Sequence, residues 1–113
     1  MADSTVSTKV DNYMTGTTQF ATGLTASVTQ TQGGALVLTS IINDVTTVAT
    51  ANDAVVIKTA VADDRVTIYN NGAAILQVFP AASDNLGNGV DASTTIDPGQ
   101  FGVFTAKDTT NWI

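Results

Sequence analysis

The sequence predicts an all-β protein, and three observations carry that prediction. Thr occurs twenty times, Ala fifteen times and Val thirteen times, and the β-branched Thr and Val lose rotamer freedom in helices but pack well on a pleated sheet. Glu is absent and Lys occurs three times, so straight-chain helix formers are scarce. Short alternating runs of apolar and polar residues recur between turn residues. We therefore expect a β-sandwich or a small barrel of seven to eight short antiparallel strands.

The first part of the chain differs from the rest. Residues 1–23 are rich in Thr, Ser, Asp and Asn, and their apolar residues are scattered. This composition predicts an extended N-terminal arm that orders against a partner, followed by one β-sandwich domain over 24–113. A purely solvating tail has little use for aromatic side chains, so the apolar residues of the arm are the candidate partner-binding residues. They are Val6, Val10, Tyr13, Met14 and Phe20.

Turn residues divide the N-terminal half into short strands. Leu24, Ala26 and Val28 alternate with polar residues, which is the spacing of a half-buried strand. The stretch 35–42 is expected to be a strong strand that ends at Asn43-Asp44. Residues 45–51 fit a strand or a short turn, because their threonines resist a helical period. Turns are expected at 32–34 and 51–53, and a further short strand at 54–57.

The C-terminal half has clearer strands. Residues 65–69 and 75–79 both alternate, and Asn70-Asn71-Gly72 between them tolerates the positive φ of hairpin turns. We therefore expect these two strands to pair as a hairpin, ended by Pro80, which cannot donate to a β-ladder. Further strands are expected at 93–96 and 101–106, with a loop at 81–91 and turns at 97–99 and 107–111.

Charge and composition argue against several classes of partner. Four basic residues against ten acidic ones give a formal net charge of −6, whereas nucleic acids and anionic membranes are bound by cations. No apolar run approaches the ~20 residues of a membrane helix. The first eleven residues lack the apolar core of a signal peptide. Without Cys the chain has no disulfide and no thiolate metal site.

The side chains from which most enzyme sites are built are scarce. His is absent, so a Ser or Thr nucleophile would need a carboxylate or one of the three lysines, Lys9, Lys58 and Lys107, as its base. Asp63-Asp64 is the only adjacent carboxylate pair, and adjacent residues of an extended chain point to opposite faces. We expect a solvated turn there, no catalytic residue, no cofactor, and a protein that is not an enzyme.

Two patterns look like binding sites but have simpler explanations. Residues 84–91 resemble a calcium loop, but the third ligand position of an EF-hand would be Leu86 and no Glu follows, so we expect an ordinary Gly/Asn loop and no metal. The aromatic residues could stack on a carbohydrate or fill a small core, and their place in alternating strands favours the core. These aromatic residues are Tyr69, Phe79, Phe101, Phe104 and Trp112.

The segment 64–80 resembles a segment of small structural proteins of tailed bacteriophages. In those proteins an N-x-G-A hairpin leads to an apolar strand that ends in V-[FY]-P, then to a Gly/Asn-rich loop, a Pro-Gly or Ala-Gly turn, a Phe-containing strand and a late Trp. Residues 52–57 are similar to a preceding strand of the same proteins, usually D-G-V-x-L-P, although this chain has Ala54 for Gly and lacks the Pro. The resemblance covers 52–113. Its later positions here are 87–89, Pro98-Gly99, Phe104 and Trp112.

The resemblance implies a virion component, made in the host cytoplasm. Together with the composition it favours a capsid decoration (cement) protein on the outer surface of the phage head, bound to the major capsid protein. We expect a homo-oligomer, and a trimer would fit a site where three capsid subunits meet. The alternative is a fibre or tail-associated module that recognises a host glycan or protein. An exposed Trp112 would favour that alternative, and a buried one the structural role.

Overall fold

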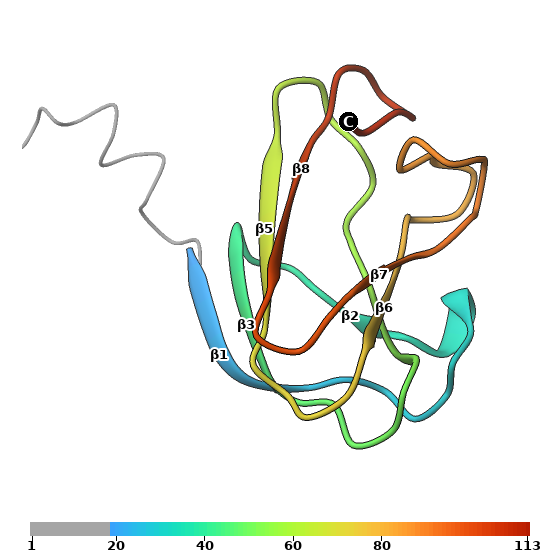
Figure 1. Cartoon of the computed structure of the whole chain (residues 1–113). Coiled ribbons are helices and arrows are strands. Elements are labelled where there is room, and N and C mark those ends of the chain that lie inside the picture. The colour runs from blue at the N-terminus through green and yellow to red at the C-terminus, as the bar shows by residue number, and fades with distance from the viewer. Residues whose placement is uncertain (1–18) are drawn as a thin grey trace, which may run out of the picture.

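The computed structural model describes residues 19–113, and their fold is all-β (Figure 1). The strands form two four-stranded sheets, which we name sheet A, with the order β1-β3-β5-β8, and sheet B, with the order β2-β4-β6-β7. The expected seven to eight strands are found. The elements are β1 (Phe20–Thr25), a short 3-10 helix η1 (Gln32–Gly34), β2 (Leu36–Val37), β3 (Ile42–Thr47), β4 (Asp53–Val56), β5 (Arg65–Asn70), β6 (Leu76–Phe79), β7 (Thr94–Ile96) and β8 (Phe101–Thr105).

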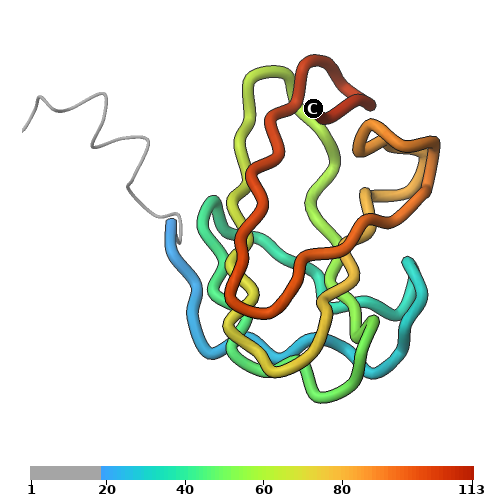
Figure 2. The backbone as a smooth tube through the Cα atoms, in the orientation of Figure 1, coloured from blue at the N-terminus to red at the C-terminus, as the bar shows by residue number. Residues whose placement is uncertain are grey.

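The chain changes sheet after each strand from β1 to β5, and Figure 2 follows this path. Strands that are neighbours within a sheet therefore run in the same direction, so β1, β3 and β5 are parallel, as are β2, β4 and β6. Only β7 and β8 pair antiparallel, with β6 and β5. The expected antiparallel arrangement is thus wrong for most strand pairs, because the connections cross between sheets instead of folding back within one.

The expected hairpin at Asn70-Asn71-Gly72 is one of these crossings. β5 lies in sheet A and β6 in sheet B, so the two strands do not pair. The Asn70 side chain is fully buried, and its Nδ2 donates to the carbonyls of Ala74 (2.9 Å) and Ile96 (2.8 Å). Its Oδ1 accepts from the Gly72 N–H (2.9 Å). The predicted turn exists, but Asn70 uses its amide to hold a bend between the two sheets.

The single strand expected at 35–42 is also a crossing. Only Leu36–Val37 belongs to sheet B, and the chain joins sheet A at Ile42. Asn43-Asp44, expected to end a strand, instead lies inside β3. Asn43 is buried, and its Nδ2 donates to the carbonyl of Ser40 at 2.9 Å. This bond pairs the Nδ2 of Asn43, whereas its buried Oδ1 has no hydrogen-bond partner among the described residues.

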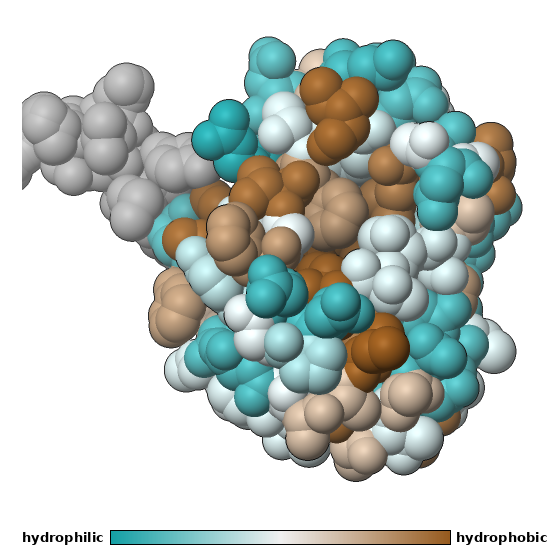
Figure 3. All heavy atoms as spheres, viewed as in Figure 1, coloured by the Kyte–Doolittle hydropathy of each residue, from teal (hydrophilic) through white to brown (hydrophobic). Residues whose placement is uncertain are grey.

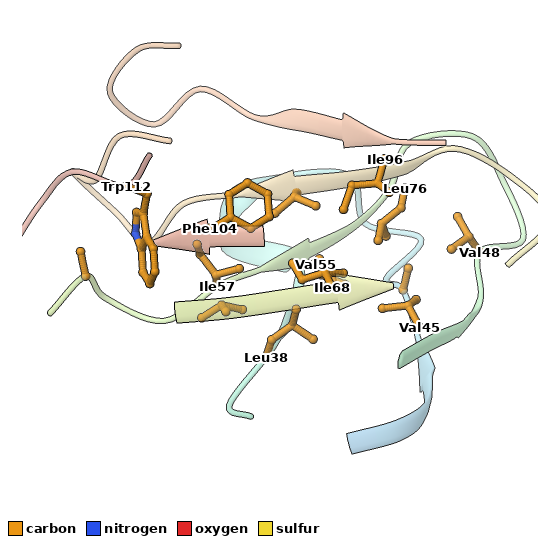
Figure 4. Close-up of a cluster of buried hydrophobic side chains, with 14 of the residues drawn as sticks. Leu38, Val45, Val48, Val55, Ile57, Ile68, Leu76, Ile96, Phe104 and Trp112 are labelled. Atoms are coloured by element: carbon orange, nitrogen blue, oxygen red, sulfur yellow. The ribbon is translucent and has the colours of Figure 1, made fainter. Parts of the chain in front are cut away.

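The two sheets share one buried apolar cluster (Figure 4). Sheet A contributes side chains of β3, β5 and β8, and sheet B contributes side chains of β4, β6 and β7. A smaller cluster lies on the other face of sheet B, where Ala35 packs with Ala54, Val56 and Phe79. β4 is therefore covered on both faces, which explains why all four of its residues are buried. The main cluster consists of Ala26, Leu38, Val45, Val48, Val55, Ile57, Ala60, Val66, Ile68, Leu76, Val78, Ile96, Phe104, Ala106 and Trp112.

The first strand begins earlier than expected. β1 starts at Phe20, so the boundary expected after residue 23 falls inside a strand that pairs with β3. The strand expected at 24–29 is shifted towards the N-terminus, and Gly23 has a φ of 71° beside a register shift in this pair. The rest of the expected arm, 1–18, lies outside the described residues. Within 19–113 no helix has the length and apolarity that a membrane crossing requires.

Gly72 gives a test of the crossing after β5. A Cβ built on Gly72 would lie 2.5 Å from the backbone N of Val48, so Gly72→Ala forces the backbone apart. We expect a loss of about 1–3 kcal/mol in the free energy of unfolding, as for other overpacked sites. Gly33→Ala is the control, because a Cβ there meets nothing within 4 Å. Urea denaturation of both variants measures the difference, and equal midpoints would contradict the close approach.

Candidate functional site

The Asp63-Asp64 pair lines a hollow of about 350 Å³ where β1, β3 and β5 begin. The two residues lie at the turn before β5, as expected. The rule for adjacent residues of an extended chain does not apply here, because Asp63 adopts a φ of 75° and the chain turns, and both residues line the hollow. The Lys58 ammonium forms an ion pair with the Asp64 carboxylate. Asp64 therefore acts as a counter-ion in this hollow.

The loop that resembles a calcium site is held together by its own hydrogen bonds. Asp84 is buried, and its carboxylate accepts from the Ala60 N–H (2.9 Å). The Asp91 carboxylate accepts from the Ser83 N–H (2.7 Å) and from the side chain of Gln32 (3.0 Å). Among residues 19–113 no three His, Cys, Asp or Glu side chains come together to hold a metal ion. Asp84 thus fastens the loop to the segment between β4 and β5, and Asp91 fastens it to the segment before β2.

Asp108 orders the last turn of the chain in the same way. Its carboxylate accepts from the backbone N–H groups of Thr110 and Asn111, both at 2.9 Å, and from the Asn111 side chain. These bonds lower the pKa of Asp108, the bond from the Thr110 N–H contributing most, because they favour the ionised carboxylate. The pKa of Asp91 is lowered for the same reason, chiefly by Gln32. Both carboxylates thus organise turns.

The expected aromatic core is found for two residues of the set. Phe104 and Trp112 are buried in the main cluster, and Figure 4 shows Trp112 at one end of it beside Phe104. Trp112 is only 1% exposed, so it offers no platform to a ligand. Phe79 is half-buried against the smaller cluster. Trp112 therefore meets the criterion set above for a structural role.

Tyr69 and Phe101, in contrast, lie on the surface. They are neighbours across β5 and β8, with ring centroids 5.4 Å apart. Phe101 is 59% exposed, and Val103 on the same strand is also exposed. The expectation that these aromatic residues fill the core is wrong for this pair, because β8 turns Phe104 inwards and Phe101 outwards. The signal was in the sequence: β8 has bulky apolar residues on both of its faces.

These side chains belong to a larger surface, the outward face of sheet A, which we name the open face. The pairings align Phe20, Ile42, Thr67 and Val103 in one row across the four strands, and Asp44, Tyr69 and Phe101 in the next. Figure 3 shows apolar side chains among hydrophilic ones beside the start of the grey segment, where β1 begins. The open face thus carries four exposed hydrophobic side chains, Phe20, Tyr69, Phe101 and Val103, among threonines, Asp44 and Arg65.

Of the candidate partner-binding residues, the structure describes Phe20. It is 55% exposed and begins β1, at the edge of the open face. The other four, Val6, Val10, Tyr13 and Met14, lie outside the described residues. Their part in binding therefore stays a prediction, and Phe20 marks where the preceding segment joins the sheet.

Comparison with protein-family models, with curated proteins and with solved structures finds no match to this chain.

The lowered pKa of Asp108 predicts how stability depends on pH. A depressed carboxyl pKa adds stability above its value in the unfolded chain, about 3.8, and this contribution is lost as the pH falls through the folded pKa. We expect Asp108→Ala to lower the melting temperature at pH 7 and to differ less from the parent as the pH falls below 3.8 and through the folded pKa. Asp97→Ala is the control, since the exposed Asp97 side chain makes no hydrogen bond within the described residues. Melting curves at several pH values test this, and a constant difference would contradict it.

Proposed function

We propose that this protein is a capsid decoration protein, a structural virion component that binds the outer surface of a phage head and stabilises contacts between major capsid subunits. The observation that carries the proposal is the burial of Trp112 at the end of the core. A late Trp is part of the resemblance to phage structural proteins, and here it serves packing. The hypothesis that the protein is not an enzyme agrees with carboxylates that cap turns or pair with Lys58.

The architecture supports a bridging role. We take the two sheets around one cluster to be a sandwich-like block, because side chains of both sheets pack into the same buried core. Such a block resists the outward strain on a shell when it is attached at more than one point. A stable attachment buries roughly 800 Å² on each partner, and many copies on a symmetric shell add avidity.

The attachment we propose is made by the segment before β1, together with Phe20. Val6, Val10, Tyr13 and Met14 supply apolar side chains, and Phe20 continues them onto the sheet with 55% of its surface exposed. Phe20 lies on an edge strand, so a partner can approach it from the side opposite β3. The major capsid protein is the partner, and neither nucleic acid nor membrane takes part in the contact.

A second candidate function is supported by the exposed Tyr69–Phe101 pair. Aromatic rings on a surface can stack on sugar rings, as a fibre or tail-associated module recognising a host glycan would require. The buried Trp112 removes the larger platform, so we rank this function second. Imaging of the particle distinguishes the two: the first requires density for this chain on the head, and the second on the tail or a fibre.

The proposed attachment is tested with the full-length chain carrying Tyr13→Ser and Met14→Ser. Each change removes an apolar side chain whose burial stabilises a contact by about 1.5–3 kcal/mol, so we expect binding to undecorated capsids to weaken more than tenfold. Val28→Ser is the control, because Val28 is an exposed apolar residue in the loop between β1 and η1 and is not one of the proposed attachment residues. Co-sedimentation with capsids measures binding. Unchanged binding of the double variant, or of a chain lacking residues 2–18, would overturn the proposal.

A further inference from the structure

The two sheets differ in how their outward faces are covered. The outward face of sheet B lies under the segment that contains η1, where Ala35 packs with Ala54 and Val56. Gln32 fastens this segment by donating to the Pro80 carbonyl (2.8 Å) and to Asp91 (3.0 Å). Among residues 19–113 no corresponding segment covers the open face of sheet A, and its apolar side chains stay exposed.

The open face also differs from the rest of the molecule in charge. The strands of sheet A contain one acidic residue, Asp44, and one basic residue, Arg65. The face is therefore neutral in a chain whose net charge is −6. Asp44 is held in place by the Thr22 hydroxyl (2.8 Å) and the Asn71 side-chain amide (2.6 Å). Two copies can thus approach through this face without repelling each other.

The two charges lie at opposite ends of the face. Arg65 is two residues before Thr67 on β5, and Asp44 is two residues after Ile42 on β3, while Thr67 and Ile42 are paired. Arg65 and Asp44 are therefore equally far, in opposite directions along the strands, from the row of Phe20, Ile42, Thr67 and Val103. A two-fold axis along that row therefore brings Arg65 of one copy close to Asp44 of the other, so that opposite charges meet.

We propose that the open face binds the open face of a second copy of this chain around a two-fold axis. The axis lies between the A sheets of the two copies and runs perpendicular to their strands. The axis sets each strand against the same strand of the other copy, running in the opposite direction. The central row then packs on itself, and Phe101 packs on Thr105 of the other copy. Arg65 faces Tyr69, with Asp44 on the next strand about 4.8 Å to the side. The interface is isologous, so each charge pair forms twice.

A second copy fits this surface better than an unrelated partner because the face complements itself. Flat sheets pack face to face about 10 Å apart, with apolar side chains between them. Four strands by five residues give a flat footprint of roughly 300 Å², below the roughly 800 Å² of accessible surface that each partner buries in a standard interface. The dimer is therefore weak in solution, and a high local concentration favours it.

This inference differs from the trimer expected from the sequence, because a face that pairs with itself closes after two copies. It also stands apart from the proposed attachment to a capsid. The experiment uses purified full-length protein without capsids, so the dimer and the decoration function can fail separately.

The test is sedimentation equilibrium of the full-length chain from about 1 to 500 µM, a range that spans weak association. We expect a monomer–dimer equilibrium, weakened at least tenfold by Phe101→Asp. Val90→Asp is the matched control, since Val90 is 63% exposed in the loop 81–91 and receives the same charge. Asp44→Lys and Arg65→Asp should each weaken self-association. An equimolar mixture of these two variants should recover a heterodimer, because each 44–65 pair then joins opposite charges.

Circular dichroism first establishes that each variant folds. If Asp44→Lys does not fold, the comparison of Phe101→Asp with Val90→Asp decides. A monomer at every concentration, a trimer, or a dimer that Phe101→Asp leaves unchanged would each overturn the proposal. So would a mixture of folded charge variants that stays as weak as its components.

Discussion

The fold depends on passing a polar backbone from one sheet to the other without leaving buried groups unpaired. Buried N–H and carbonyl groups need hydrogen-bond partners, and a chain that changes sheet after each of its first five strands meets this demand repeatedly. Asn70 meets it after β5, since one buried amide joins the carbonyls of Ala74 and Ile96 and the N–H of Gly72. At the start of β3, the Asn43 side-chain amide donates to the carbonyl of Ser40. The side-chain amides of these two residues thus pair backbone carbonyl groups where the chain passes between the sheets.

The same arrangement explains why one sheet is covered and the other is open. The connection from β1 to β2 passes over the outward side of sheet B and is fastened there by Gln30 and Gln32. The remaining crossings run at the ends of the strands, so among the described residues none covers the open face. Most acidic residues of the described chain lie outside the strands of sheet A, where Asp44 is balanced by Arg65, so this face carries no net charge. A protein with these two unlike sides is suited to contacts on one side only.

The sequence predicts the positions of most strands but not their partners. Residues 65–69 and 75–79 are strands because alternation and β-branched residues dictate local conformation, and the structure agrees. The predicted pairing of these two strands is wrong, because Asn-Asn-Gly specifies that the chain bends but does not specify the plane of the bend. The prediction of one strand over 35–42 is wrong for a related reason. In the sequence, the apolar residues of a segment that crosses between sheets cannot be distinguished from those of a strand.

The surface was harder to predict than the fold. Tyr69 and Phe101 were assigned to the core because aromatic residues in alternating strands usually pack there. The orientation of β8 is fixed by Phe104 and Ala106, which face inwards, and this choice turns Phe101 and Val103 outwards. The partner residues from Val6 to Met14 are not tested by the described residues. Trp112, in contrast, is buried, as its place near the end of an alternating strand pattern predicts for a core residue.

The position of Trp112 also bears on how the chain folds during synthesis. Trp112 fills one end of the core, and its backbone N–H donates to the carbonyl of Asn85 (2.8 Å). β8 completes sheet A by pairing with β5, and it is synthesised only shortly before Trp112. Parallel partners such as Ile42 and Thr67 are also far apart in sequence, so few contacts can form early. A nascent chain therefore cannot close this core until Trp112 has left the ribosome, and until then its apolar strands are open to chaperones.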